Sequence, residues 1–142
     1  MNQDLLFNKF VLFMTNVHQL TTDLSKGVKT EDITPMQYKI LEYIMISQSV
    51  TITEISDCMH MSLPNTSREL RKLVEKDLCE KLPDTTDRRK HYIQLTEKGI
   101  TMMQEAFRKI QLEFEDRIKN LSEEELKEID RAVDVLQNKV FF

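Results

Sequence analysis

Apolar residues recur at steps of three and four along the first part of the chain. The stripe is formed by Leu6, Phe10, Phe13, Val17, Leu20 and Leu24. This spacing predicts a helix over residues 4–24. Further apolar residues, at Leu5, Phe7, Val11, Leu12 and Met14, widen the stripe to most of the helix circumference. We therefore expect this helix to be buried from several sides.

Capping signals predict three short helices in the next part of the chain. Thr34, Pro35 and Gln37 form a capping box that opens a helix reaching about residue 46. The same pattern at 51–54 opens a helix to about residue 59, and Ser62 caps a third that ends near residue 77. Three short helices with tight connections match a helix-turn-helix module.

The period then changes to that of strands. Residues 78–82 and 91–95 are short candidate strands, and in the second His91, Ile93 and Leu95 alternate with polar positions. Between them, residues 83–90 favour a turn and end in three consecutive cations. A two-stranded hairpin with a cationic tip directly after a helix-turn-helix is a wing.

Two helices close the chain, and they are again strongly amphipathic. Thr96 caps the first and Ser122 the second. Their apolar positions are Ile100, Met103, Phe107, Ile110, Phe114, Ile118 and Leu121, then Leu126, Ile129, Val133, Leu136 and Val140. These stripes exceed what a small helix-turn-helix core can cover, so we expect the terminal helices to form a homodimer. The alternative is that they pack on each other in a monomer.

The predicted fold class is mainly α with a small two-stranded β-wing, a winged helix-turn-helix with long N- and C-terminal dimerisation helices. The chain has 142 residues, which suits a single domain over 1–142. Within it, residues 34–95 would form the winged helix-turn-helix lobe that binds DNA. Residues 1–30 and 96–142 would be the dimerisation helices.

Net charge is −4, which taken alone argues against a nucleic-acid partner. The distribution changes that conclusion. Residues 62–98 hold nine Lys and Arg against seven Asp and Glu, a net +2, whereas the rest of the chain carries −6. Positive charge is concentrated where the predicted helix-turn-helix and wing lie.

Other classes of protein find little support. The N-terminus lacks the pattern of a signal peptide, no apolar run is long enough for a membrane span, and Cys58 and Cys79 form no disulfide framework, so we expect a cytoplasmic protein. Cys58 and His60 match no common zinc spacing, which leaves no metal site and no cofactor. Because there is neither a glycine-rich phosphate loop nor a nucleophile motif, an enzyme is not expected.

The third short helix carries the candidate base-reading residues. We expect it to bury Leu63, Leu70, Leu73 and Val74 and to leave Ser62, Asn65, Thr66, Arg68, Glu69 and Lys72 towards the opposite side. Small polar groups at its N-terminal end could approach base edges in the major groove. Arg68, Arg71 and Lys72 could reach guanine edges or phosphates. For Arg71 and Lys72 the alternative is a solvated helix face.

The order Asp87-Arg88-Arg89, a short strand, then Leu95-Thr96-Glu97-Lys98-Gly99 resembles the MarR (multiple antibiotic resistance regulator) family, and the resemblance covers essentially the whole chain. It implies a winged helix-turn-helix fold and a triangular homodimer. It also implies binding of palindromic double-stranded DNA operators, usually as a repressor. It further implies that Arg89 enters a minor groove and that Asp87 holds Arg89 through a charge-assisted hydrogen bond, beside Arg88 and Lys90.

The resemblance also implies a pocket for a small aromatic or phenolic effector between the dimer helices and the DNA-binding lobe. Phe13, His18 and Met36 are candidate lining residues, although core packing is the simpler interpretation of each. Two functions remain open. The favoured one is a sequence-specific DNA-binding regulator, and the alternative is a winged-helix protein-interaction module without sequence-specific DNA binding, which the overall acidity keeps open.

Overall fold

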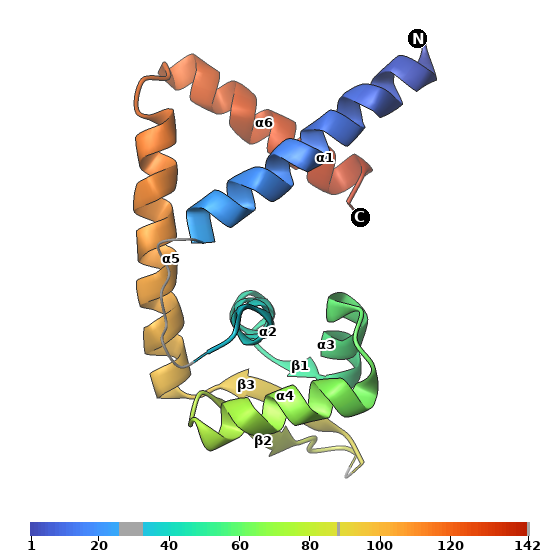
Figure 1. Cartoon of the computed structure of the whole chain (residues 1–142), viewed down its shortest axis with the longest axis vertical. Coiled ribbons are helices and arrows are strands. Elements are labelled where there is room, and N and C mark those ends of the chain that lie inside the picture. Colours follow the sequence, from blue (N-terminus) through green and yellow to red (C-terminus); the bar gives the residue numbers. More distant parts are fainter. Residues whose placement is uncertain (26–32, 88, 142) are drawn as a thin grey trace. The chain divides into compact units, whose positions relative to one another are not determined.

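The structure is a computed structural model that describes residues 1–25, 33–87 and 89–141. It contains, in chain order, α1 (Gln3–Ser25), α2 (Pro35–Ser47), β1 (Val50–Thr51), α3 (Ile52–Met59), α4 (Leu63–Glu75), β2 (Cys79–Pro83), β3 (His91–Leu95), α5 (Glu97–Ile118) and α6 (Glu123–Lys139) (Figure 1). The chain divides into two compact units, residues 29–108 and a terminal unit of residues 1–28 and 109–142. No helix in the described ranges is long and apolar enough to cross a bilayer.

The helices begin where the capping signals predicted. Side chains of Thr34, Thr51, Ser62 and Ser122 each accept the backbone N–H three residues on, at 3.1–3.2 Å. The side chain of Thr96 likewise accepts the backbone N–H of Gly99 at 3.0 Å, directly before α5 begins at Glu97. These hydrogen bonds satisfy amide groups that the helix itself leaves unpaired, which is why the polar residues mark the helix starts.

The sheet has three strands, so the prediction of a two-stranded β-structure was incomplete. Its order is β1-β3-β2 with both pairs antiparallel. The extra strand is β1, in which Val50 pairs with Ile93 and Thr51 with Tyr92. Two residues are too few to show an alternating pattern, and Thr51 is also the N-cap of α3, so the local pattern indicated only a helix start.

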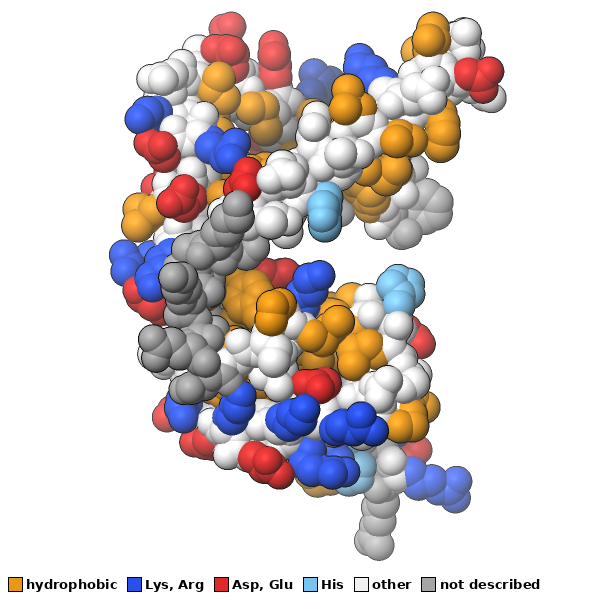
Figure 2. Space-filling view, in the orientation of Figure 1, with side chains coloured by type: hydrophobic (Ala, Val, Ile, Leu, Met, Phe, Trp, Pro, Cys, Tyr) orange, Lys and Arg blue, Asp and Glu red, His pale blue; other side chains and the backbone are white. Residues whose placement is uncertain are grey.

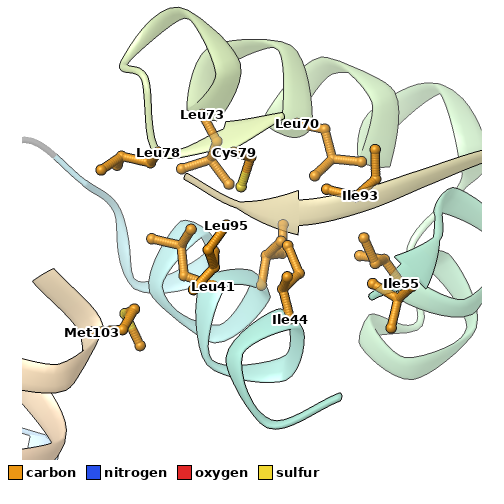
Figure 3. Close-up of a cluster of buried hydrophobic side chains, with 12 residues drawn as sticks. Leu41, Ile44, Ile55, Leu70, Leu73, Leu78, Cys79, Ile93, Leu95 and Met103 are labelled. Carbon is orange, nitrogen blue, oxygen red and sulfur yellow. The ribbon is translucent and has the colours of Figure 1, made fainter. Parts of the chain in front are cut away.

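The core of the 29–108 unit is apolar and closed. It is formed by Ile40, Leu41, Ile44, Val50, Ile55, Leu70, Leu73, Leu78, Cys79, Ile93, Leu95 and Met103. Figure 3 shows these side chains converging from α2, α4 and β3, with Met103 reaching in from α5. Every helix and strand of this unit therefore contributes to one shared core.

The buried stripe of α4 differs from the predicted one. Leu63 and Val74 were expected in the core but are 50% and 41% exposed. The stripe instead follows Thr66, Leu70 and Leu73, spaced by four and three residues, so that Thr66 occupies the position near the helix start that Leu63 was expected to fill. Thr66 is 0% exposed, and its hydroxyl donates to the carbonyl of Ser62 at 2.9 Å, which satisfies the buried polar group.

The Leu95–Gly99 segment joins the start of α5 to the turn between α4 and β2. The backbone N–H of Thr96 donates to the Leu78 carbonyl at 3.1 Å, and its hydroxyl donates to the Asp77 carbonyl at 2.6 Å. A Cβ atom at Gly99 would lie 2.2 Å from the Leu78 carbonyl oxygen. Only glycine fits there, because the neighbour is backbone and cannot move aside.

The terminal unit has few internal contacts between its helices. The ring of Phe10 lies 5.8 Å from that of Phe13 and 6.1 Å from that of Phe141, and Arg117 pairs with Asp23 at 3.7 Å. None of its described side chains is buried in the single chain, and Phe7 and Leu12 are 64% and 61% exposed. The burial predicted for α1 is therefore not achieved within one copy of the chain.

Candidate nucleic-acid interface

The exposed side of α4 is polar at its start and cationic along its length. Ser62, Asn65, Arg68, Arg71 and Lys72 all lie outside the core, and Lys and Arg side chains form a row along this helix in Figure 2. The Ser62 hydroxyl accepts the backbone N–H of Asn65 at 3.2 Å and can still donate its own proton. The first turn of α4 thus presents a hydroxyl and an amide, groups that can both donate and accept hydrogen bonds.

Thr66 does not belong to this face. It was predicted to lie with the other polar residues, but it is buried and its hydroxyl is engaged inside the helix, as described above. The prediction failed because threonine is tolerated in a helix core when its hydroxyl can return to the carbonyl four residues back. Thr66 shapes the helix and is not available to a ligand on the exposed side.

The cations of α4 differ in how strongly they are already paired. Lys72 lies 3.4 Å from a carboxylate oxygen of Glu69. Arg71 is exposed and has no ion-pair partner within the described part of the chain. Arg71 therefore offers an unneutralised guanidinium, and a ligand anion would have to share Lys72 with Glu69.

The wing is held by two aspartates that stabilise turns. The backbone N–H of Asp84 donates to the Lys90 carbonyl at 3.0 Å, and the Asp84 carboxylate accepts from the backbone and the hydroxyl of Thr86 at 3.1 Å. The Asp87 carboxylate accepts the backbone N–H of Arg89 at 3.0 Å. These are turns in which a short side chain bonds the backbone two residues on.

The contact between Asp87 and Arg89 thus differs in kind from the predicted one. Asp87 was expected to hold the guanidinium, but its carboxylate accepts the main-chain N–H and so shapes the backbone at the tip. Arg89 and Lys90 are exposed there, and Arg88 lies outside the described residues. The wing presents at least two cations from the same compact unit that contains α4.

Sequence reasoning missed the part played by Gln37 and Glu69. Gln37 is 2% exposed, and its side-chain N–H donates to the Glu69 carboxylate at 3.0 Å. This hydrogen bond, with a smaller contribution from Lys72, lowers the pKa of Glu69 from its ordinary value of 4.5. The capping box had marked Gln37 as important for α2, but nothing in the local pattern indicated a partner on another helix.

Other titratable and metal-binding candidates do not add to this face. Burial raises the pKa of the Cys79 thiol to about 12, whereas Cys58 is exposed. Burial and the nearby Glu42 carboxylate raise the pKa of Tyr38 to about 12. Within the described ranges, no three His, Cys, Asp or Glu side chains cluster as a metal site would require.

The predicted effector residues are all exposed. Phe13 and His18 belong to the terminal unit and Met36 to the 29–108 unit. The 29–108 unit contains an open pocket of about 350 Å³ whose lining residues are Ile44, Met45, Gln48, Gln94, Leu95 and Ile100. That pocket does not include Met36, so an effector site at Phe13, His18 and Met36 stays a prediction.

Comparison with known proteins finds similarity to one family. The sequence model of the MarR family matches residues 31–90, which span α2 to the wing. The HTH-type transcriptional regulator MhqR of Bacillus subtilis is 25% identical over 117 residues, which cover 82% of this chain and 81% of that relative. Residues 31–90 of this chain thus resemble the MarR family, and the chain as a whole is similar to MarR family regulators. The resemblance predicted from the Asp87–Gly99 region is therefore confirmed.

Solved structures of MarR family proteins share the fold. A MarR family protein from Bacillus stearothermophilus superposes with a TM-score of 0.85 at 20% identity, covering 100% of this chain and 99% of that one. A mutant of MarR from Escherichia coli, in complex with operator DNA, superposes with a TM-score of 0.61 at 24% identity, covering 92% and 97%. The predicted winged helix-turn-helix fold, mainly α with a small β-wing, is confirmed with the third strand added.

Proposed function

We propose that this protein is a sequence-specific transcriptional regulator that binds a palindromic DNA operator as a homodimer and represses transcription. The observation that carries the proposal is the exposed polar and cationic side of α4, which lies in the same compact unit as the cationic wing. A helix of this kind fits the major groove, and an adjacent cationic hairpin fits the neighbouring minor groove. The E. coli MarR structure with operator DNA supports it by similarity of fold.

The proposed DNA-binding residues divide into those that would contact base edges and those that would contact phosphates. Ser62, Asn65 and Arg68 stand at the start of α4, where side chains can reach base edges. Arg71 and Lys72 lie further along the helix and would contact phosphates, which fix orientation without reading sequence. In the wing, Arg89 would enter the minor groove, with Asp87 setting the backbone and Arg88 and Lys90 at its sides.

The terminal unit supports the dimer. Its described side chains include large apolar groups that stay exposed in the single chain, such as Leu5, Phe7 and Leu12 on α1 and Val135 on α6. Exposed apolar surface of this extent marks an interface. We propose that residues 1–30 and 96–142 join two copies, and that each copy presents its 34–95 lobe to one half of a palindrome.

Repression follows from occupancy, because a dimer on its operator excludes other proteins from the same DNA. A small aromatic effector that binds the free form more tightly than the DNA-bound form would relieve repression. Phe13, His18 and Met36 are the residues that we propose for contacting the effector. A screen in which no small aromatic compound changes both thermal stability and operator affinity would remove this part of the proposal.

Selection of duplexes from genomic fragments tests the proposal as a whole. We expect a palindromic site bound more tightly than random duplex, with an affinity that falls steeply as salt rises because phosphate contacts release counterions. A folded dimer that selects no site, and whose weak association ignores salt, would contradict the proposal. That outcome would favour the protein-interaction module.

A further inference from the structure

The side of α4 beside the DNA-facing stripe carries a partly buried polar link to α2. Glu69, Lys72 and Lys76 recur at steps of three and four and so share one side of the helix. Gln37, in the first turn of α2, reaches this side. Its side-chain N–H donates to Oε2 of Glu69 at 3.0 Å, and its side-chain oxygen lies 3.4 Å from Nζ of Lys76.

Both ends of the Gln37 amide are in use. The same side-chain oxygen accepts the backbone N–H of Thr34 at 3.1 Å, which completes the capping box of α2. Because Gln37 is 2% exposed, water cannot replace a partner that is lost. The side chain therefore couples the start of α2 to Glu69 on α4 and to Lys76, the C-cap residue directly after α4.

The Glu69 carboxylate is committed to protein partners in turn. Oε2 accepts from Gln37, and Oε1 lies 3.4 Å from Nζ of Lys72. Its side chain is 20% exposed, so the carboxylate lies at the edge of the protein surface with one partner on each oxygen. A free carboxylate on this helix would repel the phosphates of a duplex in its groove, since like charges brought together across an interface are costly.

We propose that Gln37 is a positioning residue for DNA recognition, which holds Glu69 away from the phosphate backbone and fixes α4 against the first turn of α2. This inference rests on the proposed function. It assigns to α2, which presents no residue to the DNA in that proposal, a direct influence on operator affinity. Arg68 and Lys72 are the cations that act electrostatically on Glu69 from its own helix, and Lys76 reaches it through Gln37.

Gln37→Glu tests the donor specifically. The new carboxylate keeps the shape and can still accept from Thr34 and Lys76, but it removes the N–H that Glu69 uses and adds a negative charge. Two carboxylates then face each other, and we expect affinity for the selected duplex to fall about tenfold, as loss of a hydrogen bond to a charged group predicts. Adding Glu69→Gln reverses donor and acceptor, and the swapped pair Q37E/E69Q should bind within about threefold of the unaltered chain.

Glu75 supplies the matched control, since it is an exposed acidic residue on the same helix. Q37E/E75Q has the same net charge as Q37E/E69Q but does not rebuild the hydrogen bond, so it should stay close to Q37E. The proposal is overturned if folded Q37E binds like the unaltered chain, or if both double variants recover affinity equally. Thermal unfolding of each variant separates loss of fold from loss of binding.

If the Q37E variant does not fold, Gln37→Leu is used in its place, because leucine removes both the N–H donor and the oxygen acceptor of the side-chain amide. Q37L/E69Q should then bind more tightly than Q37L/E75Q, because only the first removes the released carboxylate; equal affinities would overturn the proposal. If the unaltered chain selects no duplex at all, the proposed function has failed and this inference falls with it. If the unaltered chain binds and the variants do not differ, only the role of Gln37 has failed.

Discussion

The two compact units of this chain have similar apolar stripes and very different interiors. In the 29–108 unit, side chains such as Ile40, Leu41 and Leu73 are completely buried. In the terminal unit, where α1 and α6 cross and Phe10 touches Phe141, no described side chain is buried (Figure 1). The first unit completes its core within one copy, whereas the second leaves its apolar groups exposed.

The difference shows what an amphipathic pattern does and does not specify. It identifies the side of a helix that avoids water, but not whether the covering surface comes from the same chain. For the 29–108 unit the sheet, the three short helices and the first part of α5 supply that surface. For the terminal unit we attribute it to a second copy, and substitutions in the two units should therefore behave differently.

The largest expected contrast is between Leu73→Ala and Leu12→Ala. Leu73 is 0% exposed, and its truncation should lower the free energy of unfolding by about 2–5 kcal/mol at any protein concentration. Leu12 is 61% exposed in the single chain, so its truncation should act on dimer formation and lose its effect on dilution. Urea unfolding at two protein concentrations measures both. A loss of unfolding free energy for Leu12→Ala that does not depend on protein concentration would contradict the proposed difference between the two units.

Gly99→Ala should be nearly as damaging within the 29–108 unit. The added methyl would meet the Leu78 carbonyl oxygen at 2.2 Å and push the start of α5 away from the turn between α4 and β2. We expect a loss of about 3 kcal/mol in unfolding free energy, the upper range for overpacking against backbone. Thr101→Ala, at an exposed position of the same helix, is the control and should change stability by less than about 0.5 kcal/mol.

Arg89→Ala should separate binding from folding. Arg89 is exposed, so we expect unchanged thermal stability and operator binding weakened by about 1–3 kcal/mol. Arg131→Ala removes a cation from α6 in the terminal unit and should leave operator affinity almost unchanged. Titration of labelled operator duplex measures both variants. Equal losses from the two would show that net charge and not the wing governs binding.

The smallest expected effect is on how the free energy of unfolding depends on pH. The pKa of Glu69 is lowered in the folded chain, chiefly by the hydrogen bond from Gln37, so this contact stabilises the fold above the ordinary pKa of 4.5. The contribution is lost as pH falls through the folded-state pKa. The difference in unfolding free energy between the unaltered chain and Glu69→Gln should therefore shrink from about pH 6 towards about pH 3. A constant difference over that range would contradict the assigned contact.

Much of the fold could be predicted because its signals are local. The caps at Thr34, Ser62 and Ser122 and the heptad-like apolar spacing depend on neighbours three or four residues away. The errors came where tertiary contacts decide. Thr66 is buried because its side of α4 packs against the rest of the unit, and β1 exists only because β3 lies beside it.

The candidate interface shows the same division. The exposed cations of α4 and the wing follow from local pattern and the Asp87–Gly99 motif. The link from Gln37 to Glu69 joins positions 32 residues apart and leaves no periodic trace. Asp87 shows a related limit, because its partner in the structure, the backbone N–H of Arg89, depends on turn geometry that the residue pattern does not give.

We propose that the 29–108 unit reads DNA and that the terminal unit joins two copies to do so. The most direct test is the mass of the complex on a selected duplex, measured by sedimentation. The account predicts two chains on one palindromic duplex, with half-sites about 10 base pairs apart or a multiple of that distance. A single chain bound to an asymmetric site, or a dimer that binds no selected duplex, would contradict it.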